Sequence, residues 1–328
     1  MPKAIRFHKI GGPENLVLET VPLGRPAEGE ARLRVAAVGL NRAEALFMRG
    51  QYFEQPVLPS RIGYEAAGVV EEVGPGVDQS WIGKKVATVP GYSMSQHGVL
   101  GDEAIVPVIA MAEYPPSLTH VQGAAIWMQY LTAYGALVMR AGIGQKDFVV
   151  ITAASSSVGL AAIQIANAER ATAIAITRTS EKRAELIALG ADHVIVTDEE
   201  NLVQRVNEIT GGKGARIVFD PVGGSLVEQL AAATAPLGTI FEYGWLSFQP
   251  TPFPMAALGK GISVRGYSLR EVRSDPAILK PATKYVYDRL ADGRFVPKIS
   301  KTFPLEQAAD AYRYLESNAQ VGKVVVAV

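Results

Sequence analysis

A turn of small residues between two apolar segments is the part of this sequence best suited to bind a ligand. It comprises Ala154, Ser155, Ser156, Ser157, Val158 and Gly159. The run before it, Phe148 to Thr152, is short and β-branched, which predicts a buried strand, and the run after it has the spacing of a helix packed on a sheet. The free N–H groups and the positive dipole end at such a helix start favour a pyrophosphate. The turn therefore predicts a dinucleotide site, although alanine and serine replace the first two glycines of the usual motif and only Gly159 is kept.

The residues after the next strand predict which dinucleotide binds. The strand Ala171 to Thr177 is followed by Arg178 and Lys182, where an NAD site would place an acidic residue for the ribose 2′-hydroxyl. A carboxylate would repel a 2′-phosphate, whereas Thr177, Arg178 and Lys182 can hold it by charge-assisted hydrogen bonds. NADPH is therefore the predicted cofactor. The competing interpretation is that Ser180 caps the next helix and that the two cations are solvated surface charges.

These residues need a framework of alternating strands and helices, and residues 123–266 supply one. Buried runs alternate there with helical segments, which is typical of a doubly wound α/β domain with a six-stranded parallel sheet. Strands are expected at 148–152, 171–177, 193–196, 216–219, 239–242 and 262–267. Ligands of such sheets bind beyond the carboxyl ends of the strands, so Thr152, Thr177, Asp220 and the run 243–245 should share one rim.

The two ends of the chain, residues 1–122 and 267–328, predict a second, β-rich domain. Its first part alternates short strands with Gly and Pro turns. The expected elements are strands at 31–35 and 67–73, a short helix at 40–50 with Asn41 near its cap, helices at 285–290 and 305–315, and a last strand after Gly322 that can rejoin the N-terminal sheet.

Composition limits the classes of function. The 328 residues are 48% hydrophobic and 20% charged, which suits about two globular domains. The 32 basic residues balance 32 acidic ones, so no net field would draw in nucleic acid or a membrane surface. The chain has no cysteine, which excludes disulfides, thiolate nucleophiles and cysteine-ligated zinc. With no signal-peptide core and no apolar stretch long enough to span a bilayer, a cytoplasmic enzyme is expected.

The sequence resembles the medium-chain dehydrogenase/reductase superfamily, and within it the zeta-crystallin-like quinone oxidoreductases. The resemblance runs essentially end to end and rests on short motifs in a shared order. They are residues 39–41, 49–50, 59–68, 131–134, 154–159, 190–192, 220–224 and 322–323. It implies a GroES-like catalytic domain, 1–122 plus 267–328, into which a Rossmann domain, 123–266, is inserted.

The resemblance also implies chemistry without zinc. Where the zinc alcohol dehydrogenases of this superfamily place Cys, His and Cys, the matching positions here are Asn41, Tyr64 and Met128, which do not form a zinc-binding set. Without a Lewis acid, alcohol oxidation is disfavoured. Reduction of a quinone or an α,β-unsaturated carbonyl needs mainly orientation and a hydrogen bond to the oxygen, so this NADPH-dependent reduction is the implied reaction.

The resemblance assigns roles to individual residues. Expected near the nicotinamide are Asn41, Thr132, Tyr243 and Gly244. Catalytic candidates are Asn41, Tyr52, Tyr64 and Thr132. Further candidates for the substrate cavity are Tyr130, Trp245 and Tyr267. For each aromatic side chain, ordinary core or rim packing is the competing interpretation.

Assembly and two other functions follow by analogy with the same family. A homodimer, or a tetramer, would form by pairing the last Rossmann strands across a two-fold axis. One alternative function is an NADPH-binding protein with a structural or RNA-binding role, although the neutral charge argues against nucleic acid. The other is an enoyl-thioester reductase, which would need a channel and cationic contacts that the sequence does not indicate.

Overall fold

The computed structural model describes residues 1–328 and divides them into two compact units. The first unit comprises 1–128, 287–291 and 296–328, and the second comprises 129–286 and 292–295. The sequence placed the later boundary at 266, so residues 267–286 belong to a different unit from the one expected. Tyr285 explains part of this difference, because its hydroxyl donates to Glu169 at 2.6 Å and its ring packs on Tyr134 inside the second unit.

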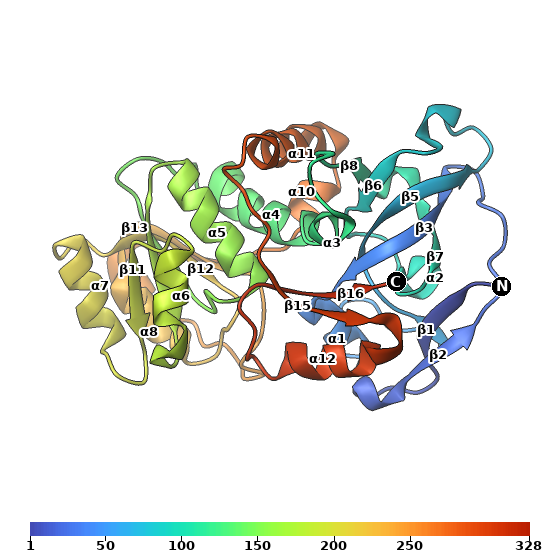
Figure 1. Ribbon diagram of the computed structural model, residues 1–328. Helices are drawn as coiled ribbons and strands as arrows, with labels where there is room; N and C mark the ends of the chain where they lie inside the picture. The colour runs from blue at the N-terminus through green and yellow to red at the C-terminus, as the bar shows by residue number, and fades with distance from the viewer. The chain divides into compact units, whose positions relative to one another are not determined.

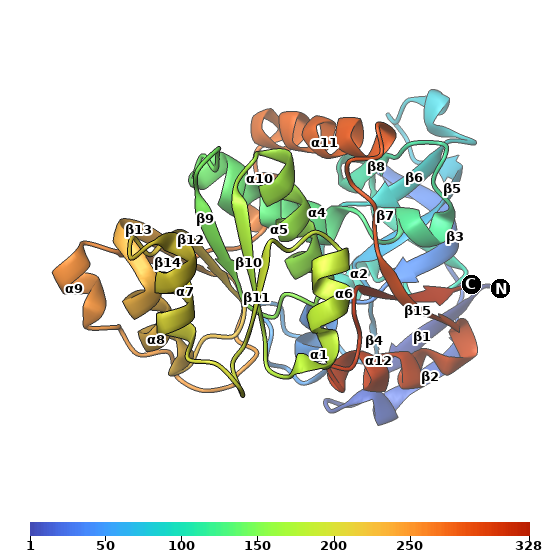
Figure 2. The ribbon, with the colours of Figure 1, turned by 60° about the vertical axis from the view of Figure 1, so that its left-hand side comes forward.

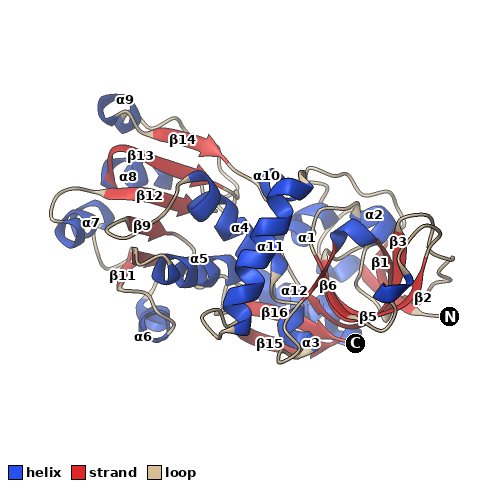
Figure 3. Cartoon of the chain, turned by 90° about the horizontal axis from the view of Figure 1, so that it is seen from above, coloured by secondary structure: helices blue, strands red, loops and turns tan.

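A six-stranded parallel sheet forms the centre of the second unit. Its strands run in the order β11-β10-β9-β12-β13-β14, and each neighbouring pair is parallel. They are β9 (Phe148–Ile151), β10 (Thr172–Thr177), β11 (His193–Val196), β12 (Ala215–Asp220), β13 (Thr234–Glu242) and β14 (Ser263–Gly266). The predicted Rossmann sheet is thereby confirmed, and Figure 3 shows β14, β13, β12 and β9 in succession.

Helices bury this sheet on both faces. Val150 and Val218 point toward a core that includes Leu230 of α8 (Leu226–Ala233), whereas α5 (Ser157–Ala168) packs against β9 and β10 (Figure 2). Val149 and Ile151, which alternate with Val150, are also fully buried, as expected for a doubly wound parallel sheet. The helices are α4 (Trp127–Tyr134), which spans the boundary of the units, a π-helical segment (Gly135–Arg140), α5 (Ser157–Ala168), α6 (Arg183–Ala188), α7 (Leu202–Thr210), α8 (Leu226–Ala233), α9 (Ala256–Lys260) and α10 (Arg270–Arg273).

Helix α11 (Pro276–Ala291) is longer than the helix expected at 285–290. Pro276 occupies the first helical position, where proline is tolerated, and the Asp275 carboxylate accepts the Ala277 N–H at 2.8 Å. Pro281 lies inside the helix, and such a proline is ordinarily read as a helix end. The sequence pattern therefore predicted a helix shorter than α11. No helix of either unit is long and apolar enough to cross a membrane.

The first unit is built on two sheets. The larger runs β15-β16-β3-β5-β6-β8, with β7 paired to β3, and the smaller runs β2-β1-β4. The strands are β1 (Lys3–Phe7), β2 (Leu16–Thr20), β3 (Glu30–Gly39), β4 (Ser60–Arg61), β5 (Glu65–Val73), β6 (Lys85–Thr88), β7 (Glu103–Pro107), β8 (Met111–Glu113), β15 (Ile299–Pro304) and β16 (Lys323–Ala327). The helices are α1 (Arg42–Met48), α2 (Met94–His97), α3 (His120–Gly123) and α12 (Ala308–Glu316), and Figure 1 shows α12 beside β15 and α1.

The last strand joins the N-terminal sheet, as predicted. β16 pairs antiparallel with β3, which pairs on its other side with β5. In this register the end of β3, Gly39, lies between Glu65 of β5 and Val325 of β16. Three segments that are far apart in the sequence therefore meet at one end of β3, and this meeting point contains the polar cluster described below.

Candidate active site

The turn 154–159 leads from β9 into α5 and has the form of an anion site. The Ser156 hydroxyl accepts the Gly159 N–H at 3.0 Å and caps the helix, while its own O–H can still donate to a ligand. A Cβ atom on Gly159 would lie 2.6 Å from the Ala154 carbonyl oxygen, so glycine is required for this close approach. With 12 residues, α5 carries the helix dipole and free N–H groups that favour a phosphate.

The strained backbone position of this turn is Ala153, one residue before the first glycine position of the motif, Ala154. Ala153 has φ of 44°, in the left-handed region that glycine adopts at least cost. The motif comparison located the missing glycines at Ala154 and Ser156, but neither of these has a positive φ.

The predicted 2′-phosphate residues lie next to this turn. The Lys182 ammonium group donates to the Ser155 hydroxyl at 3.2 Å. Burial lowers the pKa of Lys182, and the nearby charge of Arg178 lowers it further. Arg178 is exposed, and Thr177 ends β10 beside it. Two cations held close together at a helix-start turn favour a bound anion, because an anion would relieve their mutual repulsion.

The carboxyl ends of the neighbouring strands form the predicted rim around Asp220. The Thr152 hydroxyl donates to the Asp220 carboxylate. The backbone N–H groups of Val222 and Gly223 also donate to it, at 3.0 and 2.9 Å. These donors satisfy a carboxylate in its charged form.

Glu242 lies beside this carboxylate and is a site residue that sequence reasoning missed. It pairs with Asp220 across β12 and β13, so both side chains project from the same face of the sheet. Neither oxygen of Glu242 accepts a hydrogen bond, although both are buried. Burial, followed by the charge of Asp220, raises the pKa of Glu242 to about 8. Glu242 is therefore a neutral acid around pH 7, whereas Asp220 is hydrogen-bonded as an anion.

Tyr243 and Gly244 continue from this carboxyl pair. The Tyr243 ring stacks on Phe219 with centroids 4.0 Å apart, and burial raises the pKa of its hydroxyl. A Cβ atom on Gly244 would lie 2.7 Å from the Pro221 carbonyl oxygen, so only glycine fits. Thr132 is buried on α4. The contacts of Tyr243, Gly244 and Thr132 with a nicotinamide stay predictions.

The substrate-cavity candidates differ in their surroundings. Tyr130 is fully buried, stacks on Phe295 at 4.8 Å and donates to the Gln164 side chain at 2.9 Å, which is a packing arrangement. Tyr267 is buried with no hydrogen-bond partner for its hydroxyl. Trp245 is 42% exposed. The role of these three residues toward a substrate stays a prediction.

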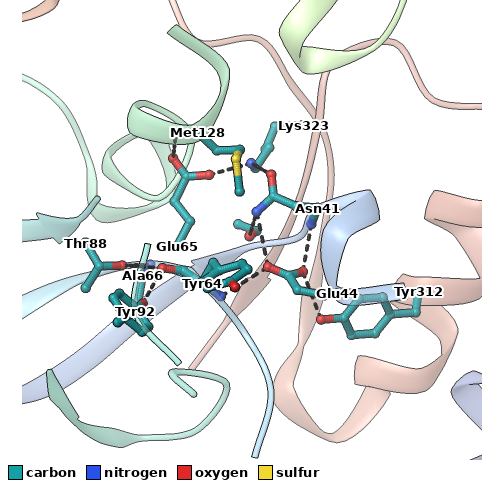
Figure 4. Close-up of polar contacts among 11 residues, drawn as sticks. Asn41, Glu44, Tyr64, Glu65, Ala66, Thr88, Tyr92, Met128, Tyr312 and Lys323 are labelled. Carbon is teal, nitrogen blue, oxygen red and sulfur yellow. Dashed lines mark hydrogen bonds and ion pairs between the residues drawn. The ribbon is translucent and has the colours of Figure 1, made fainter. Parts of the chain in front are cut away.

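The first unit holds a second polar group of residues, centred on Asn41 and Glu44 (Figure 4). Glu44 is fully buried, and burial raises its pKa. Its carboxylate accepts the Asn41 backbone N–H at 2.7 Å, the Asn41 side-chain amide at 3.2 Å, the Tyr64 N–H at 3.1 Å and the Tyr312 hydroxyl at 3.0 Å. Four donors thus offset the loss of water around Glu44.

Lys323 joins Asn41 to a second carboxylate. Its ammonium group donates to the Asn41 side-chain oxygen at 2.7 Å and to Glu65 at 2.5 Å. The other oxygen of Glu65 accepts the Met128 N–H at 3.0 Å. Asn41, Tyr64 and Met128, which the sequence resemblance places at the zinc-ligand positions, are therefore linked through Glu44, Lys323 and Glu65.

Tyr64 also belongs to a row of aromatic rings. Its ring contacts Tyr52 on one side and Tyr92 on the other, with centroids 6.2 and 5.6 Å away. Burial raises the pKa of Tyr64 and Tyr92, so both phenols are neutral donors. Next to Tyr52, the Phe53 side chain is 91% exposed. The two predicted catalytic tyrosines, Tyr52 and Tyr64, are thus in contact.

Sequence reasoning missed Glu44, Glu65 and Lys323 as site residues. The signal available for Glu65 and Lys323 is that each is a charged residue immediately before a run of small or apolar residues, 66–70 and 324–327. The structure has no group of three or more His, Cys, Asp or Glu side chains arranged to hold a metal ion.

Two domain families match the chain. Residues 27–131 match the alcohol dehydrogenase GroES-like domain, and residues 157–281 match the zinc-binding dehydrogenase domain.

Proteins similar to the chain over nearly its whole length include a 2-haloacrylate reductase from a Burkholderia species. It is 30% identical, with 99% of both chains covered. Quinone oxidoreductase 1 of Escherichia coli is 31% identical, with 98% of both covered. The crystal structure of an Escherichia coli quinone oxidoreductase complexed with NADPH has a TM-score of 0.92 at 30% identity, covering 99% of this chain and 100% of that one.

The Glu242 pKa predicts how stability depends on pH. The folded protein holds the Glu242 proton up to about pH 8, whereas an ordinary glutamate loses it near pH 4.5. Between these two pH values, folding therefore takes up a proton. The free energy of unfolding accordingly falls as the pH rises from 4.5 to 8. Glu242→Gln should flatten this decline. Between pH 5.5 and about 8 the decline amounts to about 3 kcal/mol, so we expect the melting temperature of the variant relative to wild type to rise by roughly 6–12 °C between pH 5.5 and 8.5. Glu228→Gln, at an exposed carboxylate, is the control, and equal pH slopes in wild type and Glu242→Gln would exclude the raised pKa.

Proposed function

Because the chain belongs to the quinone oxidoreductase family of the medium-chain dehydrogenases/reductases, we propose that it transfers hydride from NADPH to a quinone or an α,β-unsaturated carbonyl without zinc. It is an NADPH-dependent oxidoreductase. The observation that carries the proposal is the hydrogen bond from Lys182 to Ser155, which joins the predicted 2′-phosphate residues to the predicted pyrophosphate turn.

The residues of the second unit fit this cofactor. The close packing at Gly159 leaves the α5 N-terminus open to the pyrophosphate, and the hydroxyls of Ser155, Ser156 and Ser157 can donate to it. Arg178 and Lys182 would hold the 2′-phosphate, with Thr177 beside them. When bound, NADPH supplies the hydride. The protein's contribution is to hold the cofactor and the acceptor in a fixed orientation.

Zinc independence is supported by the residue types at the positions that hold zinc in related enzymes. Asn41 and Tyr64 offer an amide and a neutral phenol, and Met128 a thioether, which together are not a zinc-binding set. A buried ammonium group, Lys323, already occupies the position between Asn41 and Glu65. A divalent cation next to this ammonium group would meet electrostatic repulsion.

The acceptor oxygen needs a hydrogen-bond donor, and the tyrosine pair supplies one. Tyr64 keeps its proton because its pKa is raised, and Tyr52 contacts its ring. A phenol can donate to a quinone or enone oxygen and, for an enone, can pass on the proton that completes the reduction. Phe53 provides an exposed apolar surface next to this pair.

A homodimer and a cytoplasmic location complete the proposal. β14 is the edge strand of the six-stranded sheet, so one of its sides is open for pairing with a second copy. Exposed apolar side chains precede β14, including Met255, just before α9, and Leu258, on α9. The cytoplasmic location stays a prediction.

The first prediction from the proposed function is turnover without a metal ion. The purified protein should oxidise NADPH when a simple quinone or a conjugated enone is added, at a rate that a chelator does not change. Consumption is followed at the NADPH absorbance band. Activity that appears only after zinc is added would contradict the proposal, and NADPH binding without turnover of a broad acceptor panel would favour the binding-protein alternative.

The second prediction concerns the choice of cofactor. Arg178→Ala combined with Lys182→Ala should weaken NADPH binding at least tenfold, which is about 1.4 kcal/mol, and leave NADH binding nearly unchanged. Dissociation constants measured by cofactor fluorescence test this. Arg170→Ala with Lys213→Ala is the matched charge control, because both residues lie outside the turn and the cation pair. Equal affinity of wild type for NADH and NADPH would refute the 2′-phosphate assignment.

The third prediction is the assembly. Light scattering should give the mass of two chains of 35.0 kDa. Met255→Asp with Leu258→Asp should shift the protein toward the monomer, because both side chains are exposed in the single chain and their replacement costs little stability. Ile187→Asp, at an exposed apolar position on α6, is the control. A wild-type mass of one chain would contradict the dimer.

A further inference from the structure

The ion pair between Lys323 and Glu65 is almost completely withdrawn from water. Their side chains are 1% and 0% exposed, and the ammonium group lies 2.5 Å from the carboxylate. Burying two charges is costly before their mutual attraction compensates, and an apolar pair would serve stability as well. A pair kept at such a cost is more simply explained by what it positions, and the other hydrogen-bond partner of the Lys323 ammonium group is the Asn41 side chain.

The chemistry of its neighbours fixes the orientation of the Asn41 amide. Lys323 can only donate, so the atom that faces it must be the oxygen Oδ1. The nitrogen Nδ2 faces the Gly39 carbonyl at 3.0 Å and the Glu44 carboxylate at 3.2 Å, which can only accept. Rotating the amide by half a turn would place donor against donor and acceptor against acceptors. The amide is therefore held in one orientation.

This orientation limits what Asn41 can offer to a ligand. Both hydrogens of Nδ2 are used, by Gly39 and Glu44, and one lone pair of Oδ1 is used by Lys323. The remaining group is the second lone pair of Oδ1. Asn41 is 8% exposed, so a small part of the residue is open to a ligand. Asn41 can accept one hydrogen bond from a ligand and can donate none.

We propose that Lys323 and Glu65 are positioning residues that hold Asn41 as a hydrogen-bond acceptor for the cofactor, rather than as a donor to the substrate carbonyl. This inference rests on the proposed function. A quinone or an enone carries only acceptor oxygens, whereas NADPH carries donors, in its ribose hydroxyls and its carboxamide NH2. The shared chemistry is therefore a donor group of the cofactor. Polarisation of the acceptor oxygen is left to another group, such as the tyrosine pair.

The variants must separate positioning from folding. Lys323→Met alone would leave Glu65 buried and unpaired, which is strongly destabilising. Lys323→Met combined with Glu65→Gln removes both charges, and the glutamine oxygen can still accept the Met128 N–H. Asn41→Ala removes the acceptor itself. Lys301→Met, at an exposed lysine of β15, is the control for the lysine substitution. Melting curves identify the variants that fold.

The experiment is a double-mutant cycle on NADPH affinity, measured by cofactor fluorescence without turnover. Asn41→Ala and the Lys323→Met/Glu65→Gln pair should each weaken NADPH binding by up to about tenfold, the size of one hydrogen bond. All three substitutions together should weaken it no more than Asn41→Ala alone, because Lys323 acts through Asn41. Fully additive losses would contradict the positioning role.

A second cofactor distinguishes the two donor sources. The reduced 3-acetylpyridine analogue has a methyl ketone in place of the carboxamide and so lacks its N–H donor. Loss of the Asn41→Ala effect with this analogue assigns the carboxamide, and persistence assigns a ribose hydroxyl. The inference is overturned if Asn41→Ala leaves NADPH affinity unchanged and instead raises the KM of the acceptor. Binding of NADPH without reduction of any acceptor would refute the proposed function and leave this test intact.

Discussion

A buried lysine must find its hydrogen-bond partners inside the protein, and this requirement organises the polar cluster of the first unit. Lys323 begins β16, Glu65 begins β5, and Asn41 follows the end of β3. Because β3 pairs with both other strands, the three residues meet at one end of the sheet. Gly39 provides the space, since a Cβ atom there would lie 2.7 Å from Cε of Lys323. The sheet order therefore determines where the amide of Asn41 is held and which of its atoms is available.

The second unit follows a related rule, because its candidate residues collect at the carboxyl ends of parallel strands. β9 leads into the serine turn, β10 ends beside the two cations, and β12 and β13 end in the Asp220 and Glu242 carboxyl groups. Buried strands leave only their ends for polar chemistry. The turn and the cations suit an anionic cofactor, and the neutral acid Glu242 leaves one negative charge, rather than two, at the carboxyl pair.

The sequence predicted the elements whose formation depends on the local residue pattern and on neighbouring segments. The six-stranded sheet, the helix after the serine turn and the return of the last strand were confirmed. The link between Lys323 and Asn41 could not be predicted, because it depends on the register of strands more than 280 residues apart. The Asp220 and Glu242 pair depends in the same way on two strands being in register. Helix α11 was underestimated because Pro281, inside it, is ordinarily a sign that a helix ends.

In the proposed reaction, hydride passes from NADPH directly to a conjugated acceptor, with a proton supplied separately and without zinc. The most direct test uses NADPH deuterated at the transferred position, an α,β-unsaturated ketone and protein freed of metal by chelation. We predict one deuterium at the β-carbon of the saturated product and a solvent-derived hydrogen at the α-carbon, as mass spectrometry and NMR would show. A product without deuterium, or transfer that occurs only after zinc is restored, would contradict this account.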